Sequence, residues 1–471
     1  MMSKSNAGLM CRRDALKTLS AGFGYLAFSG LATLHAQQRS SLAARAPHFP
    51  ARAKSVIFLC MHGGPSHLDT FDYKPALRRD NGRSSRYAGS ALCSSPWTFR
   101  PRGQSGLWIS DLYPHLAQHA DELCLLRGMH CDNPSHAQAF VQMHTGNFQF
   151  VRPSLGAWAL YGLGTESDSL PGFISINPPT GVGGAQNYGS AFLPAAYQGT
   201  RFNIADSSQR SRPVDIARRG PANPFGLNHV RNEHLAPSLQ RVQLDLVQQL
   251  NREVLDRTGQ APLVEGAIES FELAFRMQEA VPRVMDLSTE SRETLALYGI
   301  GSELTDGFGR QCLLARRFAE AGVRFIELGH GTWDQHNNLR EAMAKNAGNT
   351  DKPIAGLIAD LKRRGMLQDT LILWGGEFGR TPHSPDGDGR DHNHKGYAMW
   401  MAGGGVKGGF SYGATDEHGY EAVENKMHIH DWHATILHLL GLDHERLTFR
   451  HASREMRLTD VSGTVARDIL A

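Results

Sequence analysis

The sequence has little that would tie it to a membrane or to a nucleic acid. After residue 36, no apolar stretch approaches the roughly 20 residues that a membrane-spanning helix needs. There is no block of basic residues, and the formal net charge is only +3. The charge pattern typical of nucleic-acid binding or of attachment to acidic lipid is therefore missing. We expect a globular protein with no nucleic-acid partner and no stable membrane span.

Cysteine is scarce, and its spacing excludes two common uses. Six cysteines occur in 471 residues, and no two of them form a Cys-x-x-Cys pair, so neither a paired-cysteine zinc site nor a thiol-disulfide redox motif is indicated. Cys60 and Cys124 lie inside apolar runs, where cysteine usually acts as a small hydrophobic residue. An N-terminal leader would remove Cys11, and an odd number would remain, which does not suit a disulfide framework.

The N-terminus has the pattern of an export signal. Residues 12–17 read RRDALK, a twin-arginine pattern, and a short apolar run follows that ends in small and polar residues at 36–38. We predict a twin-arginine signal peptide over residues 1–36, with cleavage after Ala36 or Ala46, and a periplasmic or extracellular location. An uncleaved anchor or a basic tail is the alternative interpretation.

The remaining chain alternates short apolar runs with helical patterns. This alternation predicts an α/β fold with a doubly wound, mostly parallel sheet and helices on both faces. One helix is expected from Asp306, and another is expected to open at Pro353 and to end near Gly365. The predicted buried parallel strands are Ser55–Met61, Leu123–Arg127, Phe173–Ile176, Val323–Leu328, Thr370–Trp374 and Tyr397–Met401.

We expect residues 54–471 to form a single domain that carries an insertion at about 178–300. The first part of the insertion is rich in glycine, proline, asparagine and arginine, which is typical of irregular connections. Two helices are predicted after it, over 236–256 and 264–280. The apolar positions of the first helix fall on one side, at Leu239, Val242, Leu246, Leu250 and Val254.

Four polar segments stand at predicted strand ends, and ligands of an open α/β sheet bind beyond the carboxyl ends of its strands. These segments cover 62–72, 329–337, 375–382 and 389–395. Mixed imidazole and carboxylate ligands suit zinc, manganese or iron, whereas carboxylates alone suit calcium or magnesium. Each segment could instead be structural, as a hydrogen-bonded turn or an ion pair. The candidate ligands of one or two divalent metal ions are His62, Asp334, His336, Glu377, Asp391, His392 and His394.

Several motifs resemble an exported bacterial family called domain of unknown function 1501, over residues 54–471. They include GGPSHLDTFD (63–72), GTWDQHNN (331–338), GGEFGRTP (375–382), GRDHNHKG (389–396) and HDWHATILHLLGL (430–442). That family in turn resembles the alkaline phosphatase and sulfatase superfamily. The resemblance implies an alkaline phosphatase-like fold and a metal-dependent hydrolase whose substrate is a small-molecule or polysaccharide ester of phosphate or sulfate.

The chain departs from the superfamily pattern at defined positions. His62 stands where the first strand usually ends in a metal-binding aspartate, and Glu377-Phe378 replaces a late Asp-His pair, so His392 or His394 would have to supply the histidine. Asp132 occupies the position of the residue that sulfatases convert to formylglycine, and His136 replaces the arginine of that motif. Formylglycine chemistry is therefore not expected.

The segment from Asn133 resembles the nucleophile-bearing helix of the superfamily, which makes Ser135 the candidate nucleophile. Thr145 and a metal-bound water are alternatives, and Ser135 could instead cap a helix. Arg380 and Lys395 could neutralise charge on a transferring group, or could be surface or ion-pair residues. Besides the hydrolase, a non-catalytic metal-stabilised binding or structural protein and a metal-dependent phosphomutase or transferase remain open. The oligomeric state is not predicted.

Overall fold

The computed structural model describes residues 42–87, 89–204, 235–258, 262–384 and 387–471. Leu42–Ala471 forms one compact unit. The expected signal peptide at 1–36 lies outside the described residues, and so do residues 205–234 of the irregular stretch that precedes the predicted helix at 236–256. Among the described residues, no helix combines the length and the apolar character that crossing a bilayer requires.

A nine-stranded sheet is the centre of the fold, and β1 (Ser55–Met61) lies in its middle. All six predicted strands are present, within two or three residues of their expected ends. β1 pairs in parallel with β8 and β9, and β6 continues the parallel part beyond β8. Across the sheet the order is β14 (Phe410–Tyr412), β5 (Leu123–His130), β13 (Tyr397–Ala402), β9 (Thr370–Gly375), β1, β8 (Phe325–His330), β6 (Phe173–Ile176) and β7 (Thr200–Phe202), and β17 (Met427–His428) pairs with β5.

The direction of one strand differs from the expectation. The run Tyr397–Met401 was predicted to be a parallel strand, but β13 pairs antiparallel with both β5 and β9. Parallel neighbours need a long crossover connection that usually contains a helix. Between β9 and β13 the described residues form no helix, only the short strands β10 (Gly379–Arg380), β11 (His383–Ser384) and β12 (His392–Asn393). The chain therefore returns beside β9 in the opposite direction.

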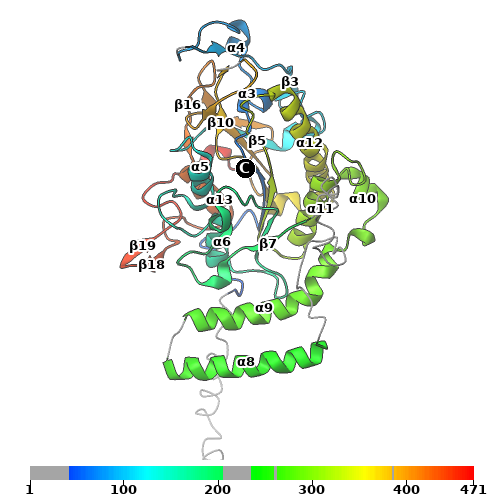
Figure 1. Ribbon diagram of the computed structural model, residues 1–471, viewed down its shortest axis with the longest axis vertical. Coiled ribbons are helices and arrows are strands. Elements are labelled where there is room, and N and C mark those ends of the chain that lie inside the picture. The colour runs from blue at the N-terminus through cyan, green and yellow to red at the C-terminus, as the bar shows by residue number, and fades with distance from the viewer. Residues whose placement is uncertain (1–41, 88, 205–234, 259–261, 385–386) are drawn as a thin grey trace, which may run out of the picture. The chain divides into compact units, whose positions relative to one another are not determined.

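Each face of the sheet packs against its own hydrophobic core, as the alternation along β1 shows. Ile57, Leu59 and Met61 belong to one core, whereas Val56 and Phe58 belong to the other. The first core includes residues of α11 (Asp306–Glu320) and α12 (Leu339–Arg363), and the second includes residues of α5 (His136–Thr145), α6 (Leu155–Leu163) and α13 (Ile429–Leu439) (Figure 1). The prediction of an α/β fold with a mostly parallel sheet and helices is confirmed.

The start of α12 was predicted wrongly. Pro353 was expected to open this helix, but the helix begins at Leu339 and Pro353 lies inside it. Proline removes one internal hydrogen bond, which usually ends a helix. Here Met343 and Ala347 before the proline, and Ile354 after it, are all buried in the first core. Tertiary packing on both sides of Pro353 thus outweighs the missing bond.

Two helices occupy the expected positions beyond the irregular stretch. They are α8 (Pro237–Thr258) and α9 (Pro262–Met285). The last turn of α9 contributes Val281 and Met285 to the first core. The apolar side of α8 is exposed instead, with 56% of Leu239 and 60% of Leu246 accessible to solvent. That these helices form an insertion remains a prediction.

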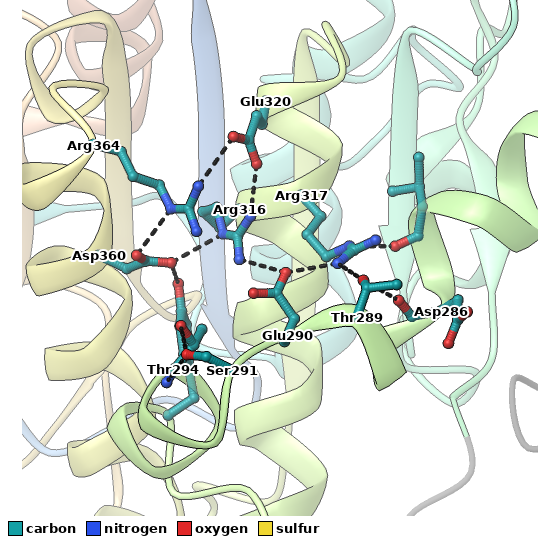
Figure 2. Close-up of polar contacts among 12 residues, drawn as sticks. Asp286, Thr289, Glu290, Ser291, Thr294, Arg316, Arg317, Glu320, Asp360 and Arg364 are labelled. Atoms are coloured by element: carbon teal, nitrogen blue, oxygen red, sulfur yellow. Dashed lines mark hydrogen bonds and ion pairs between the residues drawn. The ribbon is translucent and has the colours of Figure 1, made fainter.

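Buried charges join the helices of the first core (Figure 2). Arg316 on α11 is 3% exposed and contacts Asp360 of α12 at 3.0 Å and Glu290 at 2.7 Å. Tyr298 donates a hydrogen bond to the same Asp360 at 3.0 Å. Charged groups in the interior need such partners because desolvation is costly. The network therefore holds the segment after α9 against α11 and α12.

Candidate metal centre

Four side chains gather at the carboxyl edge of the sheet. His136 is the first residue of α5, just after β5, and Asp334 and His336 lie in the segment after β8. His392 belongs to β12, shortly before β13 begins. Because β13 runs antiparallel, its amino end meets the carboxyl ends of β5 and β8. One ligand atom from each of the four residues lies within 4.8 Å of the others, which is the spacing of a possible metal site.

The three imidazoles converge on one carboxylate oxygen. Oδ1 of Asp334 lies 3.0 Å from Nε2 of His336, 3.2 Å from Nε2 of His136 and 3.5 Å from Nε2 of His392. The Nε2 atoms of His336 and His392 are themselves 2.9 Å apart. All three rings therefore present the same nitrogen to a common point.

In two of these histidines the other ring nitrogen, Nδ1, is hydrogen-bonded to a group outside the cluster of four. Nδ1 of His392 donates to the carbonyl oxygen of Pro134 at 2.7 Å, and Nδ1 of His136 donates to Oε1 of Glu377 at 2.6 Å. A hydrogen on Nδ1 leaves the lone pair of a neutral imidazole on Nε2, which is the arrangement found in metal-binding histidines. Nδ1 of His336 lies 3.9 Å from Oδ1 of Asp391.

Glu377 supports the cluster without belonging to it. Its side chain is buried, and its two carboxylate oxygens accept hydrogen bonds from the backbone N–H of Gly63 at 3.0 and 3.1 Å. Gly63 has φ +111°, and a Cβ there would meet the backbone nitrogen of Trp333 at 2.6 Å. Only glycine fits this position, so the backbone of the first polar segment fixes Glu377 against His136.

Arg380 forms an ion pair with Asp334. Its guanidinium is fully buried, and it donates from Nη2 to Oδ1 of Asp334 at 2.6 Å and from Nε to the carbonyl oxygen of Gly64 at 2.9 Å. Burial would raise the pKa of Asp334, but hydrogen bonds from His136 and His392 and the charge of Arg380 lower it well below its usual value. Asp334 is thus a carboxylate at every physiological pH.

The same negative charges act on His136. Burial lowers its pKa, but hydrogen bonds to Asp334 and Glu377 outweigh this effect and raise the pKa to about 9. The centre thus favours a positive charge at this position, whether a proton or a metal ion supplies it.

Several predicted site residues lie outside the cluster of four. The backbone N–H of His62 donates to the carbonyl oxygen of His330 at 3.0 Å, and the carbonyl oxygen of His394 accepts from Cys131 at 2.9 Å. The side chain of Lys395 is 54% exposed and lies 3.9 Å from Glu421. Asp391 is exposed beside His336. The predicted roles of these residues stay predictions.

Ser135 and Thr145, the two candidate nucleophiles, lie at opposite ends of α5. Ser135 is exposed at the N-cap position, where its side chain makes no capping hydrogen bond. Thr145 is buried at the last position of the helix, and its hydroxyl lies 2.8 Å from the carbonyl oxygen of Val141. Ten residues of helix separate them by about 15 Å. Of the two, only Ser135 adjoins the cluster.

His136 was not among the predicted ligands. In the sequence this residue stands out only as the replacement of an arginine. A usable signal was present, because the segment 131–136 comes shortly after the predicted strand Leu123–Arg127 and contains Asp, Asn and His. It is therefore a fifth polar segment at the same edge of the sheet.

Solved structures give only distant likenesses to this chain. The lipoteichoic acid synthase LtaP from Listeria monocytogenes is 9% identical, with TM-score 0.38 over 88% of this chain and 78% of that chain. The phosphonate monoester hydrolase SpPMH from Silicibacter pomeroyi is 12% identical, with TM-score 0.35 over 82% and 73%. The PsFucS1 sulfatase from Pseudoalteromonas sp. is 13% identical, with TM-score 0.33 over 89% and 72%.

No curated protein sequence matches the chain. A family model does match, over nearly all of the sequence after the expected signal peptide. Its description is protein of unknown function (DUF1501), and it covers residues 53–470. The chain therefore belongs to the DUF1501 family.

Proposed function

We propose that this protein is an exported metal-dependent hydrolase of phosphate or sulfate esters. The observation that supports the proposal best is the convergence of three Nε2 atoms on Oδ1 of Asp334, with the outer nitrogens of His136 and His392 bonded to other groups. Outer hydrogen bonds of this kind orient metal-binding histidines, so the arrangement supports a cation site.

The donor set fits a transition-metal ion better than calcium. Three imidazole nitrogens and one carboxylate oxygen are the ligands that zinc, manganese and iron accept, whereas calcium takes oxygen ligands. Nε2 of His392 carries the lone pair of its ring when neutral, because Nδ1 donates to Pro134, and it lies 2.9 Å from Nε2 of His336, a spacing that two ligands of one ion can have. We therefore propose His136, Asp334, His336 and His392 as the ligands, with Glu377 as the outer carboxylate.

Each residue around the centre has a definite task in this proposal. A bound divalent ion would polarise a phosphoryl or sulfuryl oxygen and acidify a coordinated water. Glu377 and the carbonyl oxygen of Pro134 fix the rings of His136 and His392. Arg380 keeps Asp334 ionised and immobile.

Ser135 supplies the hydroxyl that would attack the ester. It stands between Pro134 and His136, both of which contact the centre, and its side chain is exposed to an incoming substrate. Of the two predicted cationic residues, Lys395 has the exposed side chain, and a substrate anion could reach it without displacing a buried contact.

One observation favours a second candidate, a metal-stabilised binding module without catalysis. The guanidinium of Arg380 donates to Asp334 and to backbone carbonyl oxygens and is 0% exposed, so it is not free to neutralise a transferring group. A site without that charge could hold a ligand and not turn it over.

The wider organisation is proposed on the same basis. We propose a twin-arginine signal peptide over residues 1–36, a periplasmic or extracellular location, and one catalytic domain over 54–471. N-terminal sequencing of the secreted protein would locate the cleavage site. A mature N-terminus before residue 12 would contradict the signal peptide.

Turnover is the test of the hydrolase. The purified mature protein, loaded with zinc or manganese, would be assayed with aryl phosphate and aryl sulfate esters beside His392→Ala and, as a matched control, His115→Ala at an exposed position outside the cluster. We expect hydrolysis of at least one ester class, a loss of more than 100-fold in His392→Ala, and no change in His115→Ala. Metal binding without any turnover would support the binding module instead.

A further inference from the structure

A second group of ligand-type side chains lies within the core on the α5 face of the sheet. Cys60 on β1, Glu327 on β8 and His144 on α5 are all buried, and one ligand atom of each lies within 4.8 Å of the other two. Cys60 and Glu327 stand on adjacent strands, two residues apart in register, so both side chains lie on the same face of the sheet. Neither the predicted ligands nor the proposed hydrolase uses these three residues.

The histidine of this group points its free nitrogen at the carboxylate. Nδ1 of His144 donates to the carbonyl oxygen of Phe140 at 2.8 Å, which leaves Nε2 directed at Oε1 of Glu327, 3.3 Å away. In a neutral ring that nitrogen carries a lone pair and faces a carboxylate oxygen. A positive charge between the two atoms is needed to make this contact favourable.

Glu327 also has an oxygen with no partner among the described residues. Its side chain is 0% exposed, and no described residue donates a hydrogen bond to Oε2. The cavity alongside is lined by His144, Glu327 and apolar residues such as Phe58 and Phe325, and it is too narrow for a water molecule. An ionised carboxylate in such surroundings is costly unless a charged group contacts it directly.

We propose that Cys60, His144 and Glu327 bind a second divalent transition-metal ion, with zinc as the best fit. A thiolate sulfur, an imidazole nitrogen and the two oxygens of Glu327 supply four donors, which is the number that structural zinc sites use. One thiolate and one carboxylate balance the two positive charges, so the occupied site is neutral, as its apolar surroundings demand. Binding releases the thiol proton and any proton held between His144 and Glu327.

The second ion would have a structural role: it would stabilise the packing of the elements that carry the first metal centre. Its site joins β1 and β8, which lead to Gly63 and Asp334, with α5, which begins at His136. An ion bound there would hold the last turn of α5, which carries His144, against the two strands. This role is independent of whether the first centre hydrolyses esters.

Cobalt substitution tests the proposal without relying on activity. Cobalt(II) bound to a thiolate gives an intense sulfur-to-metal charge-transfer band in the near ultraviolet, which imidazole and carboxylate ligands do not give. We expect the full-length mature protein loaded with cobalt to show this band and to hold two ions per chain. Cys60→Ser should lose the band and one ion, whereas His336→Ala should keep the band.

Cys124→Ser is the matched control, because Cys124 is equally buried in the same core but lies outside the group of three. It should keep both the band and two ions. If Cys60→Ser does not fold, X-ray absorption of the zinc-loaded wild-type protein gives the answer, with one sulfur expected at about 2.3 Å from zinc. A wild-type protein without sulfur ligation, or a band that survives in folded Cys60→Ser, would overturn the second site.

Discussion

Glu377 receives the Nδ1 hydrogen of His136 at 2.6 Å while both of its oxygens accept from the backbone of Gly63. The carboxylate of Glu377 therefore contacts the centre through His136. Its hydrogen bond to Nδ1 determines that Nε2 of this ring faces Asp334. Carboxylate–histidine pairs of this kind orient metal ligands and raise their basicity.

Replacing Glu377 by glutamine should weaken metal binding by about 10- to 100-fold, because the amide cannot hold the His136 ring with the same charge. The measurement is competition against a chelator of known affinity. Asp391→Asn is the control, since its exposed carboxylate lies 3.9 Å from His336 and should change affinity far less. Equal effects of the two substitutions would contradict the proposed role of Glu377.

Arg380→Met should destabilise the fold in addition to weakening metal binding. Breaking a buried ion pair usually costs about 3–5 kcal/mol, and because Asp334 is 38% exposed we expect the lower end of this range or less. Chemical denaturation of the metal-free protein measures the effect. Lys395→Met, at an exposed position, should change the free energy of unfolding by no more than about 0.5 kcal/mol. If Arg380→Met changed the free energy of unfolding as little as Lys395→Met does, the ion pair of Arg380 would not stabilise the fold.

A second buried pair fixes the segment that leads to His392. Nε of Arg390 lies 2.7 Å from Asp69, and both side chains are 0% exposed. Asp69→Asn should lower the free energy of unfolding by about 3–5 kcal/mol, since it leaves the guanidinium uncompensated. Combining it with Arg390→Met should cost less than the sum of the two single changes. Additive losses in urea denaturation would show that the pair is not coupled.

The stability of the protein should depend on pH in opposite ways with and without metal. In the metal-free protein the pKa of His136 is raised to about 9, so the stability gained from its protonated form is complete below about pH 6.5 and is lost as the pH rises through 9. With metal bound, the ring must be neutral, and falling pH should weaken the complex.

Thermal melting between pH 6 and 9.5 measures how the melting temperature changes with pH, both with and without zinc. We expect the melting temperature to fall with rising pH in the metal-free protein and to rise or stay level in the zinc-loaded protein. His136→Gln should remove much of the metal-free slope. Parallel slopes with and without zinc would argue against His136 as a ligand.

The sequence was sufficient for the elements and for the edge of the sheet where the centre lies. Apolar runs such as Thr370–Trp374 predict buried strands, and the polar residues that follow them predict a metal site at that edge of the sheet. Strand direction is not contained in an apolar run, so β13 was assigned the wrong direction. It nevertheless brings His392 to the expected edge, because an antiparallel strand begins where its neighbours end.

The division between proposed ligands and supporting residues required the structure. Glu377 and Asp334 both follow predicted strands, and no local pattern distinguishes them. The distinction depends on which nitrogen of His136 each carboxylate contacts, Nε2 for Asp334 and Nδ1 for Glu377, and on the backbone of Gly63, which is 314 residues from Glu377. Burial of Arg380 likewise depends on carbonyl oxygens from Gly64 and Trp333, which are far apart in the chain.

An anomalous-difference map at the zinc absorption edge, from crystals of the zinc-loaded protein, would show whether the four proposed ligands bind the ion. We expect a peak about 2.0–2.2 Å from Nε2 of His136, His336 and His392 and from a carboxylate oxygen of Asp334. A fully loaded protein with no anomalous peak among these four residues would contradict this expectation.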